Sequence, residues 1–316
     1  MKIIQGLGLP YMGSKRKLAH KIINRILKDN PNTKYFYDLF GGGGAISFNA
    51  IQRPKIKQVF YNEFNAGVVA LLKDLQQNGF TETYYQWIDR ETFHKHKDDN
   101  DWFGGLCSVV WSFGNNQKNY LFSADIEPLK KKAHEMLLGK TEYEREIKRQ
   151  ELSELLKVEI PKNVINGGLF GFDMVKARKE LANFFVTKVN KDDRGLQRLQ
   201  QLQQLQRLEI SNLSYDEVEI NTPIDETIIY LDPPYANTAK YQKDIDHDKL
   251  KEYIHNSPYK IYLSSYENVY DMHLVEEYKH RSSLSATANN EVVEKLFCNK
   301  LQSKNTKINK TPKGLI

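Results

Sequence analysis

The tetrapeptide Asp232-Pro233-Pro234-Tyr235 constrains the fold more than any other part of this 316-residue chain. It follows the segment 226–231, which is largely apolar and typical of a buried strand. Two consecutive prolines can neither continue a strand nor enter a helix interior, so the strand must end there. We therefore predict a rigid turn at the carboxyl end of a strand, with a carboxylate before the prolines and a ring after them. Ligands of open α/β sheets bind at that edge, and this group can hold a flat heterocycle that carries an amine.

A glycine run near the amino terminus also lies between a strand and a helix. Residues 34–38 are typical of a strand, Phe40 and the glycines 41–44 follow, and a helix is expected directly after them. Glycines at such a turn let the backbone approach a ligand closely. Glu63 lies 22 residues after Gly41, at the end of a second apolar strand, where an acid binds ribose hydroxyls in nucleotide-binding folds. A glycine run, a spaced acid and Asp-Pro-Pro-Tyr in this order indicate a nucleotide-like cofactor beside an amine substrate.

Strand-like and helical segments alternate in both outer parts of the chain, which implies a doubly wound α/β sheet. Helices are predicted at 15–28, 45–52 and 65–77, and strands at 35–39, 57–61, 208–212, 227–231 and 260–265, with a closing hairpin pair near 280–285 and 292–297. The alternation fails between about 80 and 200, where helical stretches at 130–157 and 173–188 predict an inserted domain. Leucines recur every third residue from 196 to 208, a period that fits neither helix nor strand, so this segment is interpreted as a connection.

Composition excludes several classes of protein. The hydrophobic content of 40% suffices for a core, and no apolar run approaches the ~20 residues of a membrane span. Two cysteines make a disulfide framework implausible, suit a reducing, cytoplasmic compartment and show no metal-ligand spacing, so no metal is expected. The net charge of +6 is compatible with a polyanionic partner. The basic tail 303–316 is expected to be disordered.

Four segments carry a resemblance to a known family. These are residues 10–18, 112–118, 281–285 and 290–297, in addition to the glycine run and the Asp-Pro-Pro-Tyr turn. The chain resembles the Dam-like (alpha-group) S-adenosylmethionine-dependent DNA adenine methyltransferases over roughly 1–80 and 205–300. The resemblance implies a Rossmann-like class I methyltransferase sheet of seven mostly parallel strands with a terminal β-hairpin. It also implies a catalytic domain formed by 1–80 and 205–302, and a mainly helical target-recognition insert at 81–204.

The same resemblance implies roles for individual residues. Asp232, Pro233, Pro234 and Tyr235 would bind and stack on the target adenine, which is flipped out of double-stranded DNA. The residues expected at S-adenosylmethionine are Tyr11, Lys15, Asp38, Phe40, Gly41, Gly43 and Glu63, together with Asp232. Lys15 would meet the methionine carboxylate, Asp38 its ammonium group and Glu63 the ribose hydroxyls. Asn115, Asn116 and Lys118 are expected at the DNA, although a polar turn that holds the insert together is the competing interpretation. No membrane partner is expected, and the chain would be a monomer or a weak dimer.

The sequence departs from the family pattern in one place and leaves three other functions open. Many relatives have an acid and an aromatic residue after the third strand, where this chain has Ser214-Tyr215, so the contact to the cofactor's adenine edge is unassigned.

A nicotinamide-dependent dehydrogenase would share the glycine run and the acid but has no need for Asp-Pro-Pro-Tyr. An RNA adenine or a DNA cytosine-amine methyltransferase would share the chemistry. A DNA-binding protein without turnover would be expected to have decayed motifs.

Overall fold

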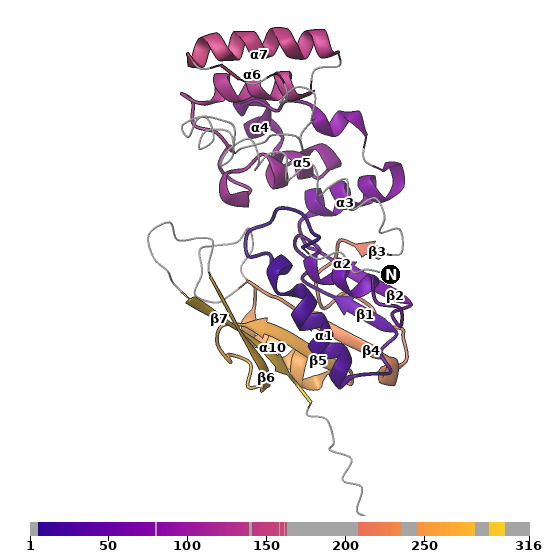
Figure 1. Cartoon of the computed structure of the whole chain (residues 1–316). Coiled ribbons are helices and arrows are strands. Elements are labelled where there is room, and N and C mark those ends of the chain that lie inside the picture. The colour runs from indigo at the N-terminus through magenta and orange to yellow at the C-terminus, as the bar shows by residue number, and fades with distance from the viewer. Residues whose placement is uncertain are drawn as a thin grey trace, which may run out of the picture.

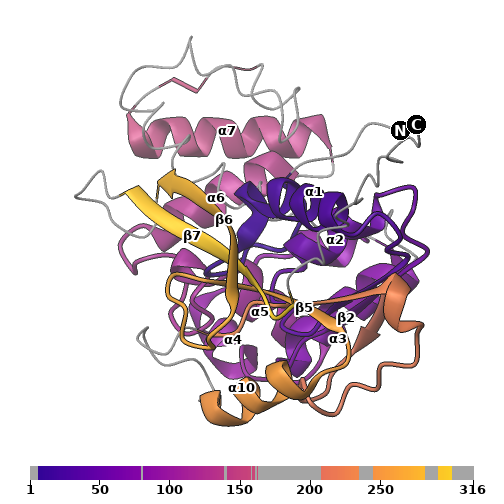
Figure 2. The ribbon, with the colours of Figure 1, turned by 90° about the horizontal axis from the view of Figure 1, so that it is seen from below.

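A seven-stranded sheet with helices on both faces forms the centre of the protein (Figure 1 and Figure 2). We describe it from a computed structural model that covers residues 6–79, 81–138, 141–157, 159–160, 162, 208–234, 245–281 and 291–300. Several sequence predictions lie outside these residues, namely Tyr235, the helix at 173–188, the leucine repeat up to residue 207, the residues 282–290 between the hairpin strands, and the tail 303–316.

The strand order is β3-β2-β1-β4-β5-β7-β6. The strands are β1 (Tyr35–Asp38), β2 (Gln58–Asn62), β3 (Leu208–Ser211), β4 (Thr227–Leu231), β5 (Lys260–Ser265), β6 (His273–Arg281) and β7 (Glu291–Cys298). Strands β1 to β5 are parallel, whereas β7 pairs antiparallel with both β5 and β6. Dinucleotide-binding folds have the order 3-2-1-4-5-6. The reversed strand β7 between β5 and β6 therefore separates this sheet from that of a dehydrogenase.

Helical segments account for most of the remaining described structure. They are η1 (Lys15–Lys17), α1 (Ala19–Asp29), α2 (Ala45–Ile51), α3 (Ala66–Asn78), η2 (Glu82–Tyr85), α4 (Arg90–His96), α5 (Trp102–Val110), η3 (Phe113–Asn115), α6 (Glu127–Leu138), α7 (Glu142–Leu156), η5 (Ile224–Glu226) and α10 (His247–Asn256). In Figure 2, α10 lies on the side of the sheet opposite to α1 and α2.

Two apolar clusters hold the helices against the sheet, because successive strand residues face opposite sides. Phe36 of β1 belongs to the larger cluster, which contains the buried side chains of α1, α2, α3 and α5. Its neighbour Tyr37 belongs to the second cluster, which contains Leu250 and Ile254 of α10. Strand β4 is buried along its whole length, as expected for a central parallel strand. The sheet edge that bears the carboxyl ends of β1 to β4 is thus fixed from both faces.

The helices α4 to α7 stack beyond α3 (Figure 1). Helices α3 and α5 cross closely enough that a Cβ on Gly105 would lie 2.0 Å from the carbonyl oxygen of Gly67. The predicted helix at 130–157 is wrong as a single element, since α6 ends at Leu138 and α7 begins at Glu142. Thr141 caps α7 in a reciprocal capping box with Glu144, which fixes the new start.

The structure confirms most of the predicted elements of the sheet and corrects one. Strands β1 to β5 and helices α1 to α3 begin and end within a few residues of the predicted bounds. The first hairpin strand was placed too late, because β6 spans His273–Arg281 instead of 280–285. It carries Glu276 and Glu277 at the sheet edge, and this polarity conceals a strand from a search for apolar runs.

Candidate functional site

A cavity of about 790 Å³ lies where the carboxyl ends of β1, β2, β3 and β4 meet. Residues that follow each of these four strands line it, together with the segment 11–15 before α1, the loop 115–118 and the start of α10. The sequence-predicted residues that line this cavity are Tyr11, Lys15, Asp38, Phe40, Gly41, Gly43, Glu63, Asn115, Asn116, Lys118, Asp232, Pro233 and Pro234. The structure therefore brings together every predicted site residue that it describes.

Close packing within the protein requires glycine at positions 41 and 43 of the glycine run. A Cβ on Gly41 would lie 2.1 Å from the ring of Tyr61, and one on Gly43 would lie 2.8 Å from the carbonyl oxygen of Leu9. Gly44 precedes α2 in the left-handed region, with φ of 75°. Tyr61 donates a hydrogen bond of 2.7 Å to the carbonyl of Gly42. These contacts hold the loop as a thin wall of the cavity that no other residue type could form.

Asp38 ends β1 and is almost fully buried, with 1% of its surface exposed. Its Oδ2 accepts hydrogen bonds from the Ser47 amide (3.2 Å) and hydroxyl (2.7 Å) at the start of α2. Its Oδ1 is buried and has no hydrogen-bond partner among the described residues. Burial raises the pKa of Asp38 to about 7, although Ser47 opposes this rise. A carboxylate with one unsatisfied oxygen in a cavity wall is suited to a cationic ligand.

Glu63 follows β2 and reaches back to the glycine run. Its Oε2 accepts a hydrogen bond of 2.8 Å from the amide of Gly42, and its Oε1 accepts one of 2.9 Å from the amide of Asn65. Burial raises the pKa of the Glu63 carboxyl, and the backbone donors lower it. Each carboxylate oxygen has a second lone pair, so Glu63 can still accept hydroxyl donors from a ligand.

Asp232 lies directly after β4 and forms an ion pair with Lys15. The Lys15 ammonium lies 2.8 Å from Asp232 Oδ1 and 3.6 Å from an oxygen of Glu294 on β7. Lys15 comes from η1, so three separate elements meet at this group of charges. Burial raises the pKa of Asp232, whereas the Lys15 charge and hydrogen bond lower it. The observed partner of Lys15 is thus the carboxylate of the Asp-Pro-Pro turn, and its predicted contact to a cofactor carboxylate stays a prediction.

The loop after β3 contributes residues that the sequence analysis did not assign. Tyr215 stacks on Phe40 with ring centroids 5.3 Å apart. The carboxylate of Asp216 accepts a hydrogen bond from the Ser214 hydroxyl and pairs with Lys249 of α10 at 2.5 Å. Asp216 lies two residues after Ser214 and lines the cavity, so this loop places an acid there. The position of the loop at the carboxyl end of a strand was the signal that could have found it.

The segment 113–118 forms a tight loop closed by the bridge between Ser112 and Tyr120. Asn115 and Gln117 both have φ of 60°, in the left-handed region. Asn116 Oδ1 accepts hydrogen bonds from the amides of Lys118 (2.9 Å) and Asn119 (3.0 Å). Gln117 accepts one of 2.8 Å from Asn65 at the start of α3. This polar turn supports the loop, and the same loop lines the cavity.

These observations define a class of protein before any comparison is made. A parallel sheet with a reversed β7, a glycine loop after β1, an acid after β2 and Asp-Pro-Pro after β4 together form a Rossmann-like methyltransferase fold. Residues 11–103, less than a third of the chain, match the family model for D12 class N6 adenine-specific DNA methyltransferases. Over these residues the chain is similar to that family, whose members methylate adenine in DNA.

Further comparisons and searches add little to this assignment. No match was found among curated proteins. Within the described residues, no helix is long and apolar enough to cross a membrane. The same part of the chain contains no group of three or more histidine, cysteine or acidic side chains arranged to hold a metal ion.

Proposed function

We propose that this protein transfers the methyl group of S-adenosylmethionine to the N6 amine of an adenine flipped out of double-stranded DNA. The observation that carries this proposal is that Asp232 and Pro233 line the same cavity as Asp38 and Glu63. Asp232 and Pro233 are suited to bind the amine that accepts the methyl group, and Asp38 and Glu63 are suited to bind a cationic nucleoside. Methyl transfer needs both groups of residues, whereas DNA binding alone would need neither.

The side chains of the cavity fit the proposed cofactor. The unsatisfied Asp38 Oδ1 can accept from the ammonium of the methionine part, and Glu63 can accept from the ribose hydroxyls. Tyr11 lies over the glycine run, where a Cβ on Gly42 would lie 3.3 Å from its ring. Phe40 and Tyr215 provide stacked rings. Ser214 and Asp216 lie beside them and are proposed to bind the edge of the cofactor's adenine ring. When bound, S-adenosylmethionine supplies an activated methyl group on its sulfonium.

Asp232 is proposed to prepare the amine of adenine for attack. The lone pair of this amine is delocalised into the ring, so the amine is a poor nucleophile. Lys15 occupies Asp232 Oδ1, which leaves the other carboxylate oxygen to accept one N6 hydrogen. The carbonyl of Pro233 is the proposed acceptor for the second hydrogen. Two acceptors draw the nitrogen toward tetrahedral geometry and free its lone pair, and the site then acts mainly by positioning.

The DNA must present its adenine inside the cavity, because only 19% of the Asp232 side chain is exposed. Bases within a duplex cannot reach such a carboxylate, so enzymes of this kind extrude the target nucleotide. Asn115, Asn116 and Lys118 are proposed to contact the DNA from the loop at the cavity rim. The helical segment 81–204 is proposed as the target-recognition insert, and 1–80 with 205–302 as the catalytic domain. The net charge of +6 supports a polyanionic substrate.

The decisive test is the transfer of a tritiated methyl group from S-adenosylmethionine to defined nucleic acids. We expect label in double-stranded DNA, and N6-methyladenine as the labelled nucleoside after enzymatic digestion and mass spectrometry. RNA of the same sequence and DNA with all adenines replaced by 2-aminopurine, which lacks the N6 amine, serve as controls. Label in RNA alone, or N4-methylcytosine as the product, would contradict the proposal.

A further inference from the structure

Glu294 is a buried acid on a strand that otherwise packs through apolar side chains. Only 2% of its surface is exposed, whereas Leu296 and Phe297 on the same strand belong to the apolar clusters. Its carboxylate lies 3.6 Å from the ammonium of Lys15, which in turn lies 2.8 Å from Asp232 Oδ1. Removing a charge from water costs several kcal/mol unless partners compensate for it. A buried carboxylate at this place therefore calls for a functional explanation.

We propose that Glu294 is a positioning residue for methyl transfer, which holds Lys15 and shares its ammonium with Asp232; this inference rests on the proposed function. Glu294 lies in the hairpin segment 290–297, but the sequence assigned no role to it, and it acts through Lys15 without touching the substrate. A lysine placed against Asp232 alone would neutralise that carboxylate and weaken it as an acceptor for the N6 hydrogen. A second carboxylate draws part of the lysine charge away and keeps Asp232 a strong acceptor.

The charges of the three residues also fit the reaction. Two carboxylates and one ammonium leave one net negative charge beside the reacting amine. During transfer the carbon–sulfur bond breaks, its electron pair stays on sulfur, and the new carbon–nitrogen bond leaves positive charge on N6 until one N6 proton departs to water. Preorganised negative charge favours that transition state, and it acts most strongly in a buried site.

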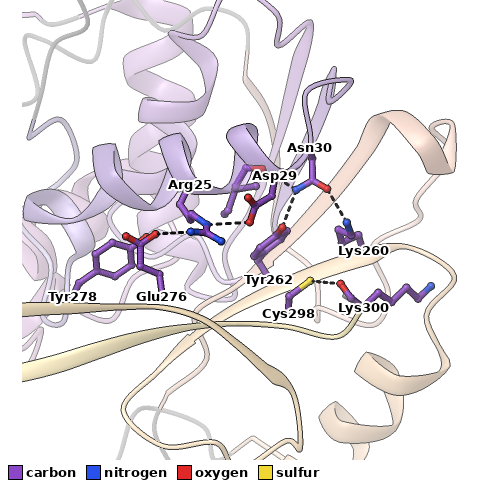
Figure 3. Close-up of polar contacts among 10 residues, drawn as sticks. Arg25, Asp29, Asn30, Lys260, Tyr262, Glu276, Tyr278, Cys298 and Lys300 are labelled. Carbon is purple, nitrogen blue, oxygen red and sulfur yellow. Dashed lines mark hydrogen bonds and ion pairs between the residues drawn. The ribbon is translucent and has the colours of Figure 1, made fainter. Parts of the chain in front are cut away.

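Polar contacts also join the helix that follows Lys15 to the strands beside Glu294. Helix α1 follows directly after the η1 turn that carries Lys15, and it is tied to β5 and the β6–β7 hairpin by polar contacts (Figure 3). Arg25 on α1 lies 3.6 Å from Glu276 on β6, and Asn30 donates a hydrogen bond of 2.8 Å to Tyr262 on β5. Helix α1 is thus joined to the same part of the sheet that carries Glu294.

The test compares Glu294→Gln, which removes the charge at constant size, with Glu294→Asp, which retains the charge on a shorter side chain. Glu277→Gln is the matched control, because Glu277 is a half-exposed acid on the same hairpin. Rates are measured in single turnovers with saturating S-adenosylmethionine and DNA, and cofactor affinity is measured separately. We expect Glu294→Gln to lose about tenfold or more in rate, the scale of a misplaced catalytic group, with cofactor affinity within about threefold of wild type. Glu294→Asp should fall between wild type and Glu294→Gln, and Glu277→Gln should match wild type.

A pH profile separates positioning from structural support. The charged and titratable groups near Asp232 are Lys15 from η1, Asp38 from β1, Tyr230 from β4, Tyr266 after β5 and Glu294 from β7. Without the Glu294 charge, the ammonium of Lys15 acts more strongly on Asp232 and lowers the pKa of its carboxyl. The single-turnover rate falls at low pH as Asp232 becomes protonated, and this fall is the acid limb of the pH profile. The acid limb should therefore move to lower pH in Glu294→Gln, and by less in Glu294→Asp.

Each outcome of the test leads to a decision. A Glu294→Gln variant with the wild-type rate and acid limb overturns the inference, as does a rate loss with an unmoved acid limb and a lowered Tm. If Glu294→Gln does not fold, Glu294→Asp decides alone, and wild-type rate and acid limb in that variant overturn the inference. A wild-type protein that transfers no methyl group to DNA refutes the proposed function itself. If the wild type transfers methyl groups and Glu294→Gln has the same rate and acid limb, this inference alone is refuted.

Discussion

Two polar clusters, one at the cavity and one between α1 and the strands β5 and β6, differ in how many of their polar atoms have hydrogen-bond partners. The cavity-edge cluster consists of Lys15, Asp38, Asp232 and Glu294; all but the partly exposed Asp232 are buried, and Asp38 Oδ1 has no hydrogen-bond partner among the described residues. The anchoring cluster joins α1 to β5 and β6 and contains Arg25, Asp29, Asn30, Lys260, Tyr262 and Glu276 (Figure 3). Its ion pair between Arg25 and Glu276 is more exposed, and the Asn30 amide both donates to Tyr262 and accepts from Lys260 at 3.0 Å.

This difference indicates that the anchoring cluster serves the fold, whereas the cavity-edge cluster serves ligand binding. A satisfied, partly exposed network adds little to stability and mainly fixes geometry. A buried carboxylate with one unpaired oxygen opposes folding when it is ionised, and it persists where function requires it. The pKa of Asp38 is raised to about 7 because burial disfavours its ionised form. The following predictions test whether the two clusters are functionally as different as their contacts are.

The largest effect is expected at Asp232. Asp232→Ala should reduce methyl transfer by at least about 100-fold, since the amine loses its acceptor, while the fold stays intact and cofactor binding is largely retained. Asp232→Asn is the matched variant, because it keeps the size and one acceptor but loses the charge. Transfer is measured with tritiated cofactor, folding by circular dichroism and binding by calorimetry. A rate above a few percent of wild type in the alanine variant would refute the assigned role.

The second prediction concerns pH and Asp38. In the free protein Asp38 is protonated below pH 7, because burial raises its pKa to about 7. Binding of a cationic ammonium requires the ionised form, so binding releases a proton in acid. The Kd for S-adenosylmethionine should rise toward about tenfold per pH unit below 7 and be constant above it. Calorimetry between pH 5 and 8 tests this expectation, and Asp38→Asn should bind weakly at every pH. A flat profile for the wild type would contradict the pairing.

The third prediction concerns the ribose contact. Glu63→Ala should weaken S-adenosylmethionine binding by about 1–3 kcal/mol, the scale for losing hydrogen bonds to a charged acceptor. Because Glu63 also accepts from the amides of Gly42 and Asn65, the alanine variant should have a lower Tm as well. Glu63→Gln keeps one acceptor and should lose less affinity. Unchanged affinity in both variants would exclude Glu63 from the cofactor site.

The fourth prediction concerns the loop at the cavity rim. Lys118→Ala should weaken binding to all duplexes and reduce the slope of log K against log salt by about one unit, if Lys118 contacts phosphate. Asn116→Ala should lower kcat/KM on the cognate duplex without changing cofactor affinity. Since Asn116 Oδ1 supports the turn, Asn116→Asp is the matched variant that keeps this acceptor and loses the amide donor. Salt-titrated binding that matches wild type for all three would move the DNA contact to another part of the insert.

The cavity residues at the strand ends were easier to predict from the sequence than the anchoring cluster. Strand ends, glycines and prolines are local signals, so Asp38, Glu63 and Asp232 were placed at one edge by the order of the elements alone. Contacts between distant residues have no such signal. Lys15 and Asp232 are 217 residues apart, and only the fold shows that they touch. Glu294 was missed for the same reason, and β6 was misplaced because its exposed charges conceal the strand.

The smallest effect is expected in the anchoring cluster. Arg25 lies 3.0 Å from Asp29 and 3.6 Å from Glu276, and about a third of its side chain is exposed. Exposed ion pairs of this kind contribute about 0–1 kcal/mol, so Arg25→Met should lower the free energy of unfolding by no more than about 1 kcal/mol. Methyl transfer should stay within about twofold of wild type, because the neighbouring contacts of Asn30 still join α1 to β5. Urea unfolding and the single-turnover rate test both expectations. A tenfold loss of rate in a stably folded Arg25→Met variant would show that the anchoring cluster also sets the distance between Lys15 and Glu294, and the division between the two clusters would then be wrong.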